Sequence, residues 1–219
     1  MNSPITTPSP GRRIAASEVV LPPTAKLRGA RGRILNAALK LFAELGYADT
    51  SVRAILSEAG AQATTLYSHF PSKEHVLAEI IRLGYEEELR RLREALLTAQ
   101  PDPRDQLKAV VRATVLTHCE YSMLAVVTSA EFHVLSDEMS APIQSMNNQA
   151  ERLALEVIER GQALGVFKIE DPVLALRAIA SMGHRAAYWF ASDAGRTPAH
   201  VAESFAGYAL LIATGGASA

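Results

Sequence analysis

The sequence is poor in cysteine and contains no long apolar run. Cys119 is the single cysteine among 219 residues, so no disulfide can form within the chain and no paired thiol ligands for zinc are present. No apolar stretch reaches membrane-spanning length, and the polar, proline-rich start of the chain lacks the continuous apolar core of a signal peptide. These absences predict a cytoplasmic protein without a membrane partner.

Strict alternation of apolar and polar residues is also missing, and so is any internal repeat. The sequence therefore offers no good candidate for a β-strand. Apolar residues instead recur at helical spacing, and a hydrophobic content of 48% is enough to bury the core of one or two compact domains. We expect an all-α protein.

Charge is divided unevenly along the chain. Residues 1–75 contain nine Lys and Arg against five Asp and Glu, a net charge of +4, which leaves −5 for the rest of a chain whose total is −1. A basic end beside an acidic body suits DNA binding through that end.

The segment 1–28 is rich in proline and is expected to be a flexible arm. Its cations at Arg12, Arg13, Lys26 and Arg28 would allow it to follow a phosphate backbone or to enter a minor groove. The alternative is a disordered, solvated leader that does not contact DNA.

Two short predicted helices that meet at Gly60 form the most informative motif. Thr50 or Ser51 can cap the first helix, and Gly60 tolerates the left-handed backbone with which a helix ends abruptly. The second helix, from about residue 62 to 70, would turn short polar and aromatic side chains outward, as contact with base edges and phosphates requires. A preceding amphipathic helix over residues 32–47 would complete a three-helix DNA-binding unit.

The order, spacing and type of these residues resemble the N-terminal domain of the TetR family (TetR/AcrR type) of bacterial transcriptional repressors. The residues that carry the resemblance are Ile34, Ala37, Phe42, Gly46, Tyr47, Thr50, Ser51, Val52, Ile55, Ala59, Gly60, Thr65, Leu66, Tyr67, His69, Phe70, Ser72, Lys73 and Glu74.

The resemblance implies two kinds of DNA contact. Tyr67, His69 and Lys73 stand at positions that grip phosphates in the family. Thr50 or Ser51 would anchor the first helix of the pair to the DNA backbone.

The resemblance also implies base-facing positions at Gln62, Thr64 and Thr65 of the recognition helix. Arg53 stands where the preceding helix can reach a base. The sequence departs from the family pattern here, because Ala61 and Gln62 replace a larger aliphatic residue and a serine that usually caps the recognition helix, and Thr64 replaces a frequent glycine.

The remaining residues, 76–219, are expected to form a helical effector-binding and dimerisation domain behind a DNA-binding domain at residues 29–75. Its predicted helices span about residues 72–97, 103–120, 122–136, 142–164, 172–191 and 198–214. The last two combine small residues with large apolar ones, more apolar surface than a lone chain needs. The resemblance implies that they pair with their symmetry mates in a homodimer, which would present two reading helices to the half-sites of a palindromic operator. The alternative is that they are ordinary core helices.

An effector pocket is expected among the middle helices, unless the same residues are ordinary core. The side chains predicted to line it are Leu116, Tyr121, Met123, Leu124, Val127, Phe132, Met146 and Trp189, with polar contacts from His118, Glu131, His133 or His184. The segments 131–133, 161–167 and 188–189 resemble a branch of the family that regulates lipid or steroid catabolism. That resemblance implies a partly hydrophobic effector such as an acyl-CoA.

Neither an enzyme nor a cofactor site is predicted. His118, Cys119 and Glu120 are adjacent on a helix, so they point in different directions and cannot form a catalytic group. His118, His133 and His184 lack the close spacing of metal ligands, and no metal site is predicted. An architectural or effector-independent DNA-binding protein is the remaining alternative, although DNA packaging would not need so large a helical body.

Overall fold

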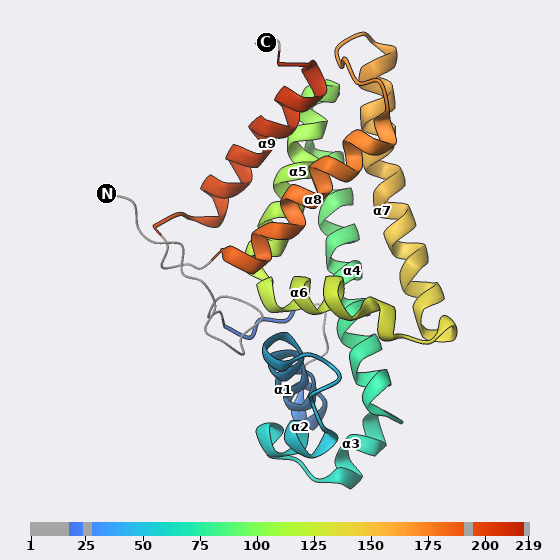
Figure 1. Cartoon of the computed structure of the whole chain (residues 1–219), viewed down its shortest axis with the longest axis vertical. Coiled ribbons are helices and arrows are strands. Elements are labelled where there is room, and N and C mark those ends of the chain that lie inside the picture. The colour runs from blue at the N-terminus through green and yellow to red at the C-terminus, as the bar shows by residue number, and fades with distance from the viewer. Residues whose placement is uncertain (1–17, 24–27, 191–194, 217–219) are drawn as a thin grey trace.

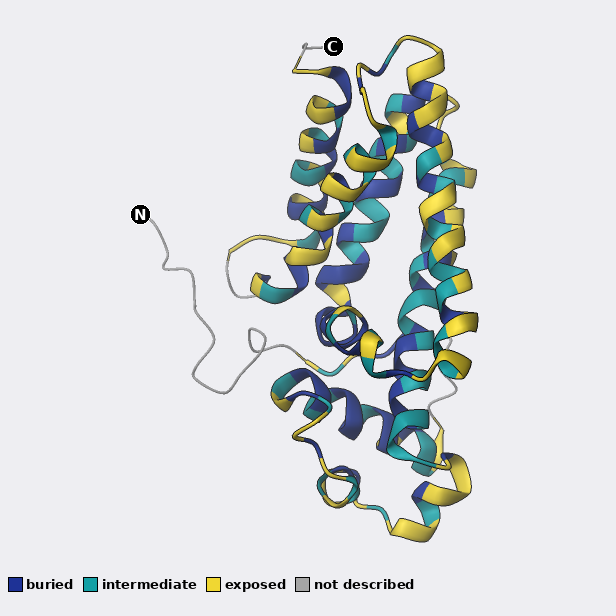
Figure 2. Cartoon of the chain, turned by 45° about the vertical axis from the view of Figure 1, so that its right-hand side comes forward, coloured by how far each residue is buried: buried dark blue, intermediate teal, exposed yellow. Residues whose placement is uncertain are grey.

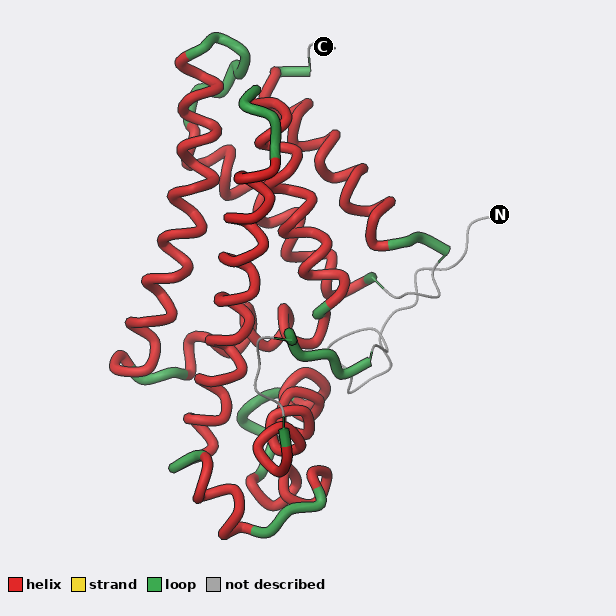
Figure 3. The backbone as a smooth tube through the Cα atoms, turned by 180° about the vertical axis from the view of Figure 1, so that it is seen from behind, coloured by secondary structure: helices red, strands yellow, loops and turns green. Residues whose placement is uncertain are grey.

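The computed structural model describes residues 18–23, 28–190 and 195–216. The described residues form helices and connecting loops without a strand, which confirms the predicted all-α class (Figure 3). The helices are α1 (Gly29–Leu45), α2 (Val52–Ala59), α3 (Ala63–His69), α4 (Lys73–Thr98), α5 (Pro103–Glu120), α6 (Ser122–Glu131), the 3-10 helix η1 (Phe132–Val134), α7 (Asp137–Ala163), α8 (Pro172–Trp189) and α9 (Pro198–Thr214). Helices α1 to α3 gather at one end of the molecule, and α4 runs from that end into the body (Figure 1).

Several helix ends lie where the sequence predicts them, because a side chain or a glycine satisfies the terminal backbone groups. The hydroxyl of Ser72 accepts a hydrogen bond from the backbone N–H of His75 at the start of α4. Asp171 caps α8, and Thr197 caps α9. Gly60 ends α2 with φ at +57°, in the left-handed region that a side chain disfavours.

The helix expected to begin at residue 142 begins earlier, at Asp137. Pro142 therefore lies inside α7. The helix continues through this proline, although Pro142 has no N–H to donate to the carbonyl of Glu138 four residues earlier. The helix predicted over residues 122–136 is shorter than expected, because α6 ends at Glu131 and continues as η1.

One apolar core extends from the N-terminal helices into the body. Phe42 of α1, Leu66 of α3 and Ile80 of α4 are fully buried in it, and so is Val127 of α6. The predicted boundary between residues 75 and 76 falls within the first turn of α4, where this core is continuous. The burial pattern in Figure 2 shows the same buried band where α1 meets α6.

The predicted arm is partly incorporated into the fold. Leu21 is only 7% exposed and belongs to the core that contains Phe42, with Val19 packed beside it. Within the expected flexible arm, Val19 and Leu21 therefore pack against the core. The cations Arg12, Arg13 and Lys26 lie outside the described residues.

A second core joins α5 to the two C-terminal helices. Val115 of α5, Ala186 of α8 and Ala206 of α9 are fully buried in it. The alanines explain how closely these helices approach, since a larger side chain would hold the backbones apart. This packing fixes α8 and α9 against the body.

No single described helix is long and apolar enough to cross a membrane. Helix α5 and residues 122–134 are long and apolar enough for a membrane span only when taken together, and a bend of 99° separates them. Both members of the pair contribute buried residues to the cores described above.

Candidate DNA-binding surface and effector cavity

Helix α3 presents one face to the core and the other to the outside. Leu66 is fully buried, whereas Gln62, Thr64 and Tyr67 are exposed, and Thr65 is half-buried. No side chain caps the start of this helix, where Gln62 stands in place of the usual serine. The four residues keep the outward arrangement that base or phosphate contact would need.

The exposed end of α2 lies beside this helix. The Ser51 hydroxyl accepts a hydrogen bond from the backbone N–H of Ala54 at 3.1 Å and so caps α2. Ser51, Arg53 and His69 are all exposed, in keeping with the predicted contacts.

Thr50 differs from the expectation because its side chain is buried. It is 1% exposed, and its hydroxyl donates a hydrogen bond to the backbone carbonyl of Gly46 at 2.7 Å. The Thr50 side chain joins the end of α1 to the start of α2, so a contact from this side chain to DNA is excluded in this conformation. The cap of α2 and the exposed hydroxyl belong to Ser51 alone.

Lys73 is engaged inside the protein. Its Nζ donates hydrogen bonds to the backbone carbonyls of Tyr47 and Thr50, each at 2.8 Å, and lies 4.0 Å from the centre of the Tyr47 ring. Desolvation by the surrounding chain lowers the pKa of the amine from its usual value. Lys73 therefore ties α4 to the loop between α1 and α2, a structural role that the sequence did not indicate.

Other cations at this end are paired with protein groups as well. Arg31 forms an ion pair with Glu79, and Lys40 forms one with Glu58 at 2.6 Å. The guanidinium of Arg33 donates to the carbonyl of Ala59 at 3.2 Å. The excess positive charge of residues 1–75 is thus partly used to join helices, and less of it faces outward than a count of charges suggests.

A cavity of about 390 Å³ lies in the body between α4, α5, α7 and α8. Its apolar wall is formed by Leu92, Val110, Val111, Val115, Leu176 and Ile179. Its polar side chains are Glu88, Thr114, Asn147, Asn148, Glu151, Arg152, Arg177 and His184. An apolar space with a few polar groups is the usual form of a small-molecule site.

None of the apolar residues predicted to line a pocket borders this cavity. Those residues are Leu116, Tyr121, Met123, Leu124, Val127, Phe132, Met146 and Trp189, and they are packed in or against the two cores or, for Trp189, lie 40% exposed on α8. The sequence could not distinguish a core position from a cavity wall, because both require apolar side chains at helical spacing. Of the predicted polar contacts, only His184 lies at the cavity.

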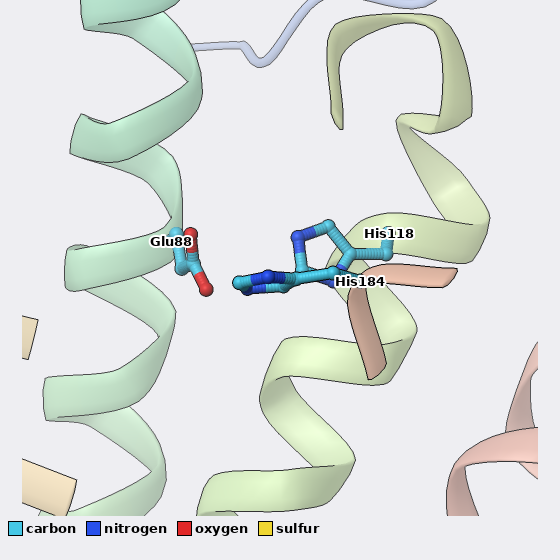
Figure 4. Close-up of side chains that lie close together, drawn as sticks. All are labelled: Glu88, His118 and His184. Carbon is cyan, nitrogen blue, oxygen red and sulfur yellow. The ribbon is translucent and has the colours of Figure 1, made fainter. Parts of the chain in front are cut away.

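Three polar side chains from different helices lie close together beside the cavity, and two of them, Glu88 and His184, border it. Glu88 of α4, His118 of α5 and His184 of α8 each bring one possible ligand atom to within 4.8 Å of the others (Figure 4). The two imidazole rings lie edge to face, with centroids 4.8 Å apart. His133 is exposed on η1 and lies outside this group.

Burial sets the charge of this group. Desolvation, with a further contribution from the neighbouring His184, lowers the pKa of His118 to about 3, so its ring is neutral at physiological pH. Desolvation raises the pKa of Glu88, and only the positive form of His184 opposes that change. Glu88 could not be identified as a partner from the sequence, because it lies 30 positions before His118 along the chain.

Cys119 and Glu120 do not join His118 in a catalytic arrangement. Cys119 is buried, and desolvation raises the pKa of its thiol to about 12, which keeps it protonated and unreactive. Glu120 is exposed and forms an ion pair with Arg91 at 2.7 Å.

Helices α8 and α9 expose large apolar side chains on the outside of the body. The exposed residues are Leu174, Trp189, Tyr208, Leu211 and Ile212; Val173 is also exposed but borders the cavity. Leu174 is 64% exposed and Leu211 is 51% exposed, so these positions are not core residues of a single chain. A group of such side chains on adjacent helices is typical of a surface that binds another protein.

Helices α2 and α3 form a helix pair in which α3 is exposed, and a helical body with a cavity follows them. These features define a helix-turn-helix transcriptional regulator. Comparison with known families agrees with this class. Residues 34–80 match the model of bacterial regulatory proteins of the tetR family, and residues 100–213 match the tetracyclin repressor-like C-terminal domain. The chain belongs to the TetR family.

Several relatives share most of the chain. The HTH-type transcriptional repressor KstR2 of Rhodococcus jostii (strain RHA1) is 29% identical over 179 residues, which cover 81% of this chain and 87% of the relative. The structure of the ketosteroid transcriptional regulator KstR2 of Mycobacterium tuberculosis is 25% identical with a TM-score of 0.78, covering 85% of this chain and 96% of the other. AibR in complex with isovaleryl coenzyme A and operator DNA has the same fold, with 21% identity, a TM-score of 0.73 and coverage of 85% and 98%.

Replacement of Lys73 by methionine tests its structural role. The variant keeps a similar length but removes both hydrogen bonds to the carbonyls of Tyr47 and Thr50, and we expect it to lower the free energy of unfolding by about 1–2 kcal/mol. Urea denaturation of the protein without DNA measures this change. His69→Ala, at an exposed position, serves as the control and should stay within about 0.5 kcal/mol of the parent protein. If Lys73→Met were as stable as His69→Ala, the hydrogen bonds of Lys73 would not stabilise the fold, and only its predicted phosphate contact would remain as a role.

Proposed function

We propose that the protein is a repressor that binds a palindromic operator as a homodimer and is released by a small, partly hydrophobic effector. Residues 29–75 would read the DNA, and residues 76–219 would bind the effector and form the dimer. The observation that carries the proposal is the course of α4. This helix begins beside the DNA-facing surface at Lys73, and its residues Glu88 and Leu92 border the cavity.

The exposed residues of α2 and α3 support the proposed contacts with DNA. Gln62, Thr64 and Thr65 would face bases, because short polar side chains can approach the edges of base pairs in the major groove. Tyr67 and His69 would contact phosphates. These five residues belong to a helix that Leu66 holds against the core.

Ser51 and Arg53 would complete the DNA contacts from α2. The Ser51 hydroxyl accepts its internal hydrogen bond from Ala54 and keeps its own O–H for a phosphate oxygen. The Arg53 guanidinium is exposed beside α3 and would reach a phosphate or a base. Lys73 would add charge near the phosphates while it holds the loop at Tyr47 in position.

The apolar surface of α8 and α9 supports the homodimer. Burial of side chains such as Leu174, Tyr208 and Leu211 against a second copy would remove them from water, which is the main driving force of association. Two copies related by a twofold axis would present two α3 helices to half-sites about one DNA turn apart.

The form of the cavity supports an effector with an apolar part and an anionic part. Leu92, Val111 and Ile179 would surround an acyl chain or a ring system. Arg152 and Arg177 lie at the same cavity and are exposed, where a guanidinium can bind a phosphate or carboxylate group. This combination fits an acyl-CoA or a ketosteroid derivative, the classes of compound named for the relatives AibR and KstR2.

The proposed release works through differential binding. A ligand that contacts Glu88 and Leu92 would favour one position of α4 over another, and α4 would carry the movement to Lys73 and the DNA-facing helices. A difference of roughly 2 kcal/mol between the two positions would change operator affinity about thirtyfold.

The rival function is an architectural or effector-independent DNA-binding protein. It accounts for the helix pair, but it assigns no role to a cavity with charged side chains beside α4. The effector-responsive repressor accounts for both. We further propose that the protein acts in the cytoplasm, where its operator would lie.

The roles of the DNA-facing residues can be separated with an operator selected from random DNA by the parent protein. Gln62→Ala and Thr64→Ala should change the preference among operator variants, since each base contact is worth roughly 1–3 kcal/mol. Tyr67→Phe and His69→Ala should weaken binding to operator and to random DNA alike. Fluorescence anisotropy against both DNAs measures these effects. Equal losses for all four variants on both DNAs would contradict the division into base and phosphate contacts.

The dimer surface can be tested with a charge on α9. Leu211→Glu should place a carboxylate in the interface, so that light scattering shows a monomer and operator affinity falls by at least about tenfold. Leu97→Glu is the matched control, because Leu97 is 86% exposed on α4. A dimer that persists in Leu211→Glu would show that the two chains meet elsewhere.

The effector site can be tested by filling the cavity. Isovaleryl coenzyme A, longer acyl-CoA thioesters and ketosteroid derivatives are first screened for an increase in melting temperature of the parent protein. A stabilising compound should lower operator affinity about thirtyfold, and Ala150→Phe should abolish both responses while leaving DNA binding intact, because Ala150 lines the cavity. Ala163→Phe, at an exposed position on the same helix, should behave like the parent. If every stabilising compound leaves operator affinity unchanged, the release mechanism is wrong.

A further inference from the structure

We propose that Glu88, His118 and His184 form a binding site for one divalent transition-metal ion at the wall of the cavity. The three residues come from α4, α5 and α8, and their possible ligand atoms lie within 4.8 Å of one another. Figure 4 shows the two imidazole rings and the Glu88 carboxylate converging on the space between the helices. The site borders the proposed effector cavity, but the three protein ligands would bind the ion without the operator or the organic effector.

The separation of the ligand atoms is close to that of a formed metal site. Bonds of about 2.0–2.2 Å at tetrahedral angles place neighbouring nitrogen and oxygen ligands roughly 3.4 Å apart. The present separations are at most 4.8 Å, and rotations of the Glu88 and His184 side chains would close the difference. His184 is exposed and Glu88 half-buried, so both have room for such a rotation.

The third side chain, His118, is held in place, and one of its two ring nitrogens lacks a hydrogen-bond partner. It is 6% exposed, and its Nδ1 has no hydrogen-bond partner among the described residues. A buried polar atom without a partner is uncommon and calls for an explanation. Coordination of an ion by one ring nitrogen fixes the proton on the other, which can then donate to a backbone carbonyl, and the Gly183 backbone contacts this ring.

The ligand types favour a transition metal over Mg²⁺ or Ca²⁺. Two imidazole nitrogens and one carboxylate oxygen suit Zn²⁺, Co²⁺, Ni²⁺ or Fe²⁺, whereas Mg²⁺ and Ca²⁺ prefer oxygen ligands alone.

Three protein ligands leave at least one coordination position open. Glu88 and His184 border the cavity, whereas His118 is buried behind them, so the open position would face the cavity. An oxygen or nitrogen atom of a molecule bound in the cavity would complete the coordination. The ion would also join α4 to α5 and α8.

The test uses the full chain without an affinity tag, dialysed against a chelator and then against metal-free buffer. Co²⁺ is titrated by absorption spectroscopy, and Zn²⁺ by calorimetry. We expect one ion per chain, with visible d–d bands for Co²⁺. His184→Ala and Glu88→Gln should each weaken binding by at least about tenfold. Neither substitution removes a fully buried side chain, and circular dichroism verifies that both variants are folded.

His133→Ala is the matched control, because His133 is an exposed histidine outside the group and its loss should leave metal binding unchanged. Three results would overturn the proposal. They are the absence of stoichiometric metal binding by the parent protein, unchanged affinity in both His184→Ala and Glu88→Gln, and an intense near-ultraviolet thiolate band that identifies Cys119 as the ligand.

Discussion

The apolar contact between α1 and α6 is the constraint on which the rest of the structure depends. Phe42 on one side and Val127 on the other are fully buried in a single core, so the DNA-facing helices cannot turn independently of the body. Close-packed interiors transmit small displacements instead of absorbing them. The same core fixes the first half of α4, whose second half forms a wall of the cavity. A regulator of this kind needs no flexible joint between its two ends.

Polar contacts reinforce the connection where the core ends. Lys73 joins α4 to the loop at Tyr47, and Glu74 accepts a hydrogen bond from the backbone N–H of Ser136 at 2.8 Å. That bond is the main reason why the pKa of Glu74 lies below its usual value. Two adjacent residues at the start of α4 therefore make contacts in opposite directions. Lys73 contacts the DNA-facing end, and Glu74 contacts the body. A displacement of α4 has to change both contacts or carry both partners with it.

Sequence patterns predicted the helices well because their ends depend on local chemistry. Ser72, Asp171 and Thr197 cap helices through contacts with residues three positions ahead, and Gly60 ends α2 through its own backbone. The outward face of α3 follows from the same local period, with Leu66 marking the inward side. The predictions that failed involve contacts between distant segments. Thr50 is buried by Gly46 and the fold around it, and nothing in the helical period distinguishes a capping hydroxyl from its buried neighbour.

The cavity and its polar wall could not be predicted from the sequence either, because they also depend on contacts between distant segments. An apolar residue on a helix lies in the core or borders a cavity according to how neighbouring helices cross, and the crossing is not encoded in any single helix. In the sequence, Glu88 is one carboxylate among many, and His118 and His184 are two histidines with no evident connection. They meet because α5 lies between α4 and α8, an arrangement that the two apolar cores impose. The packing of α5 against α4 and α8 therefore brings Glu88, His118 and His184 together beside the cavity.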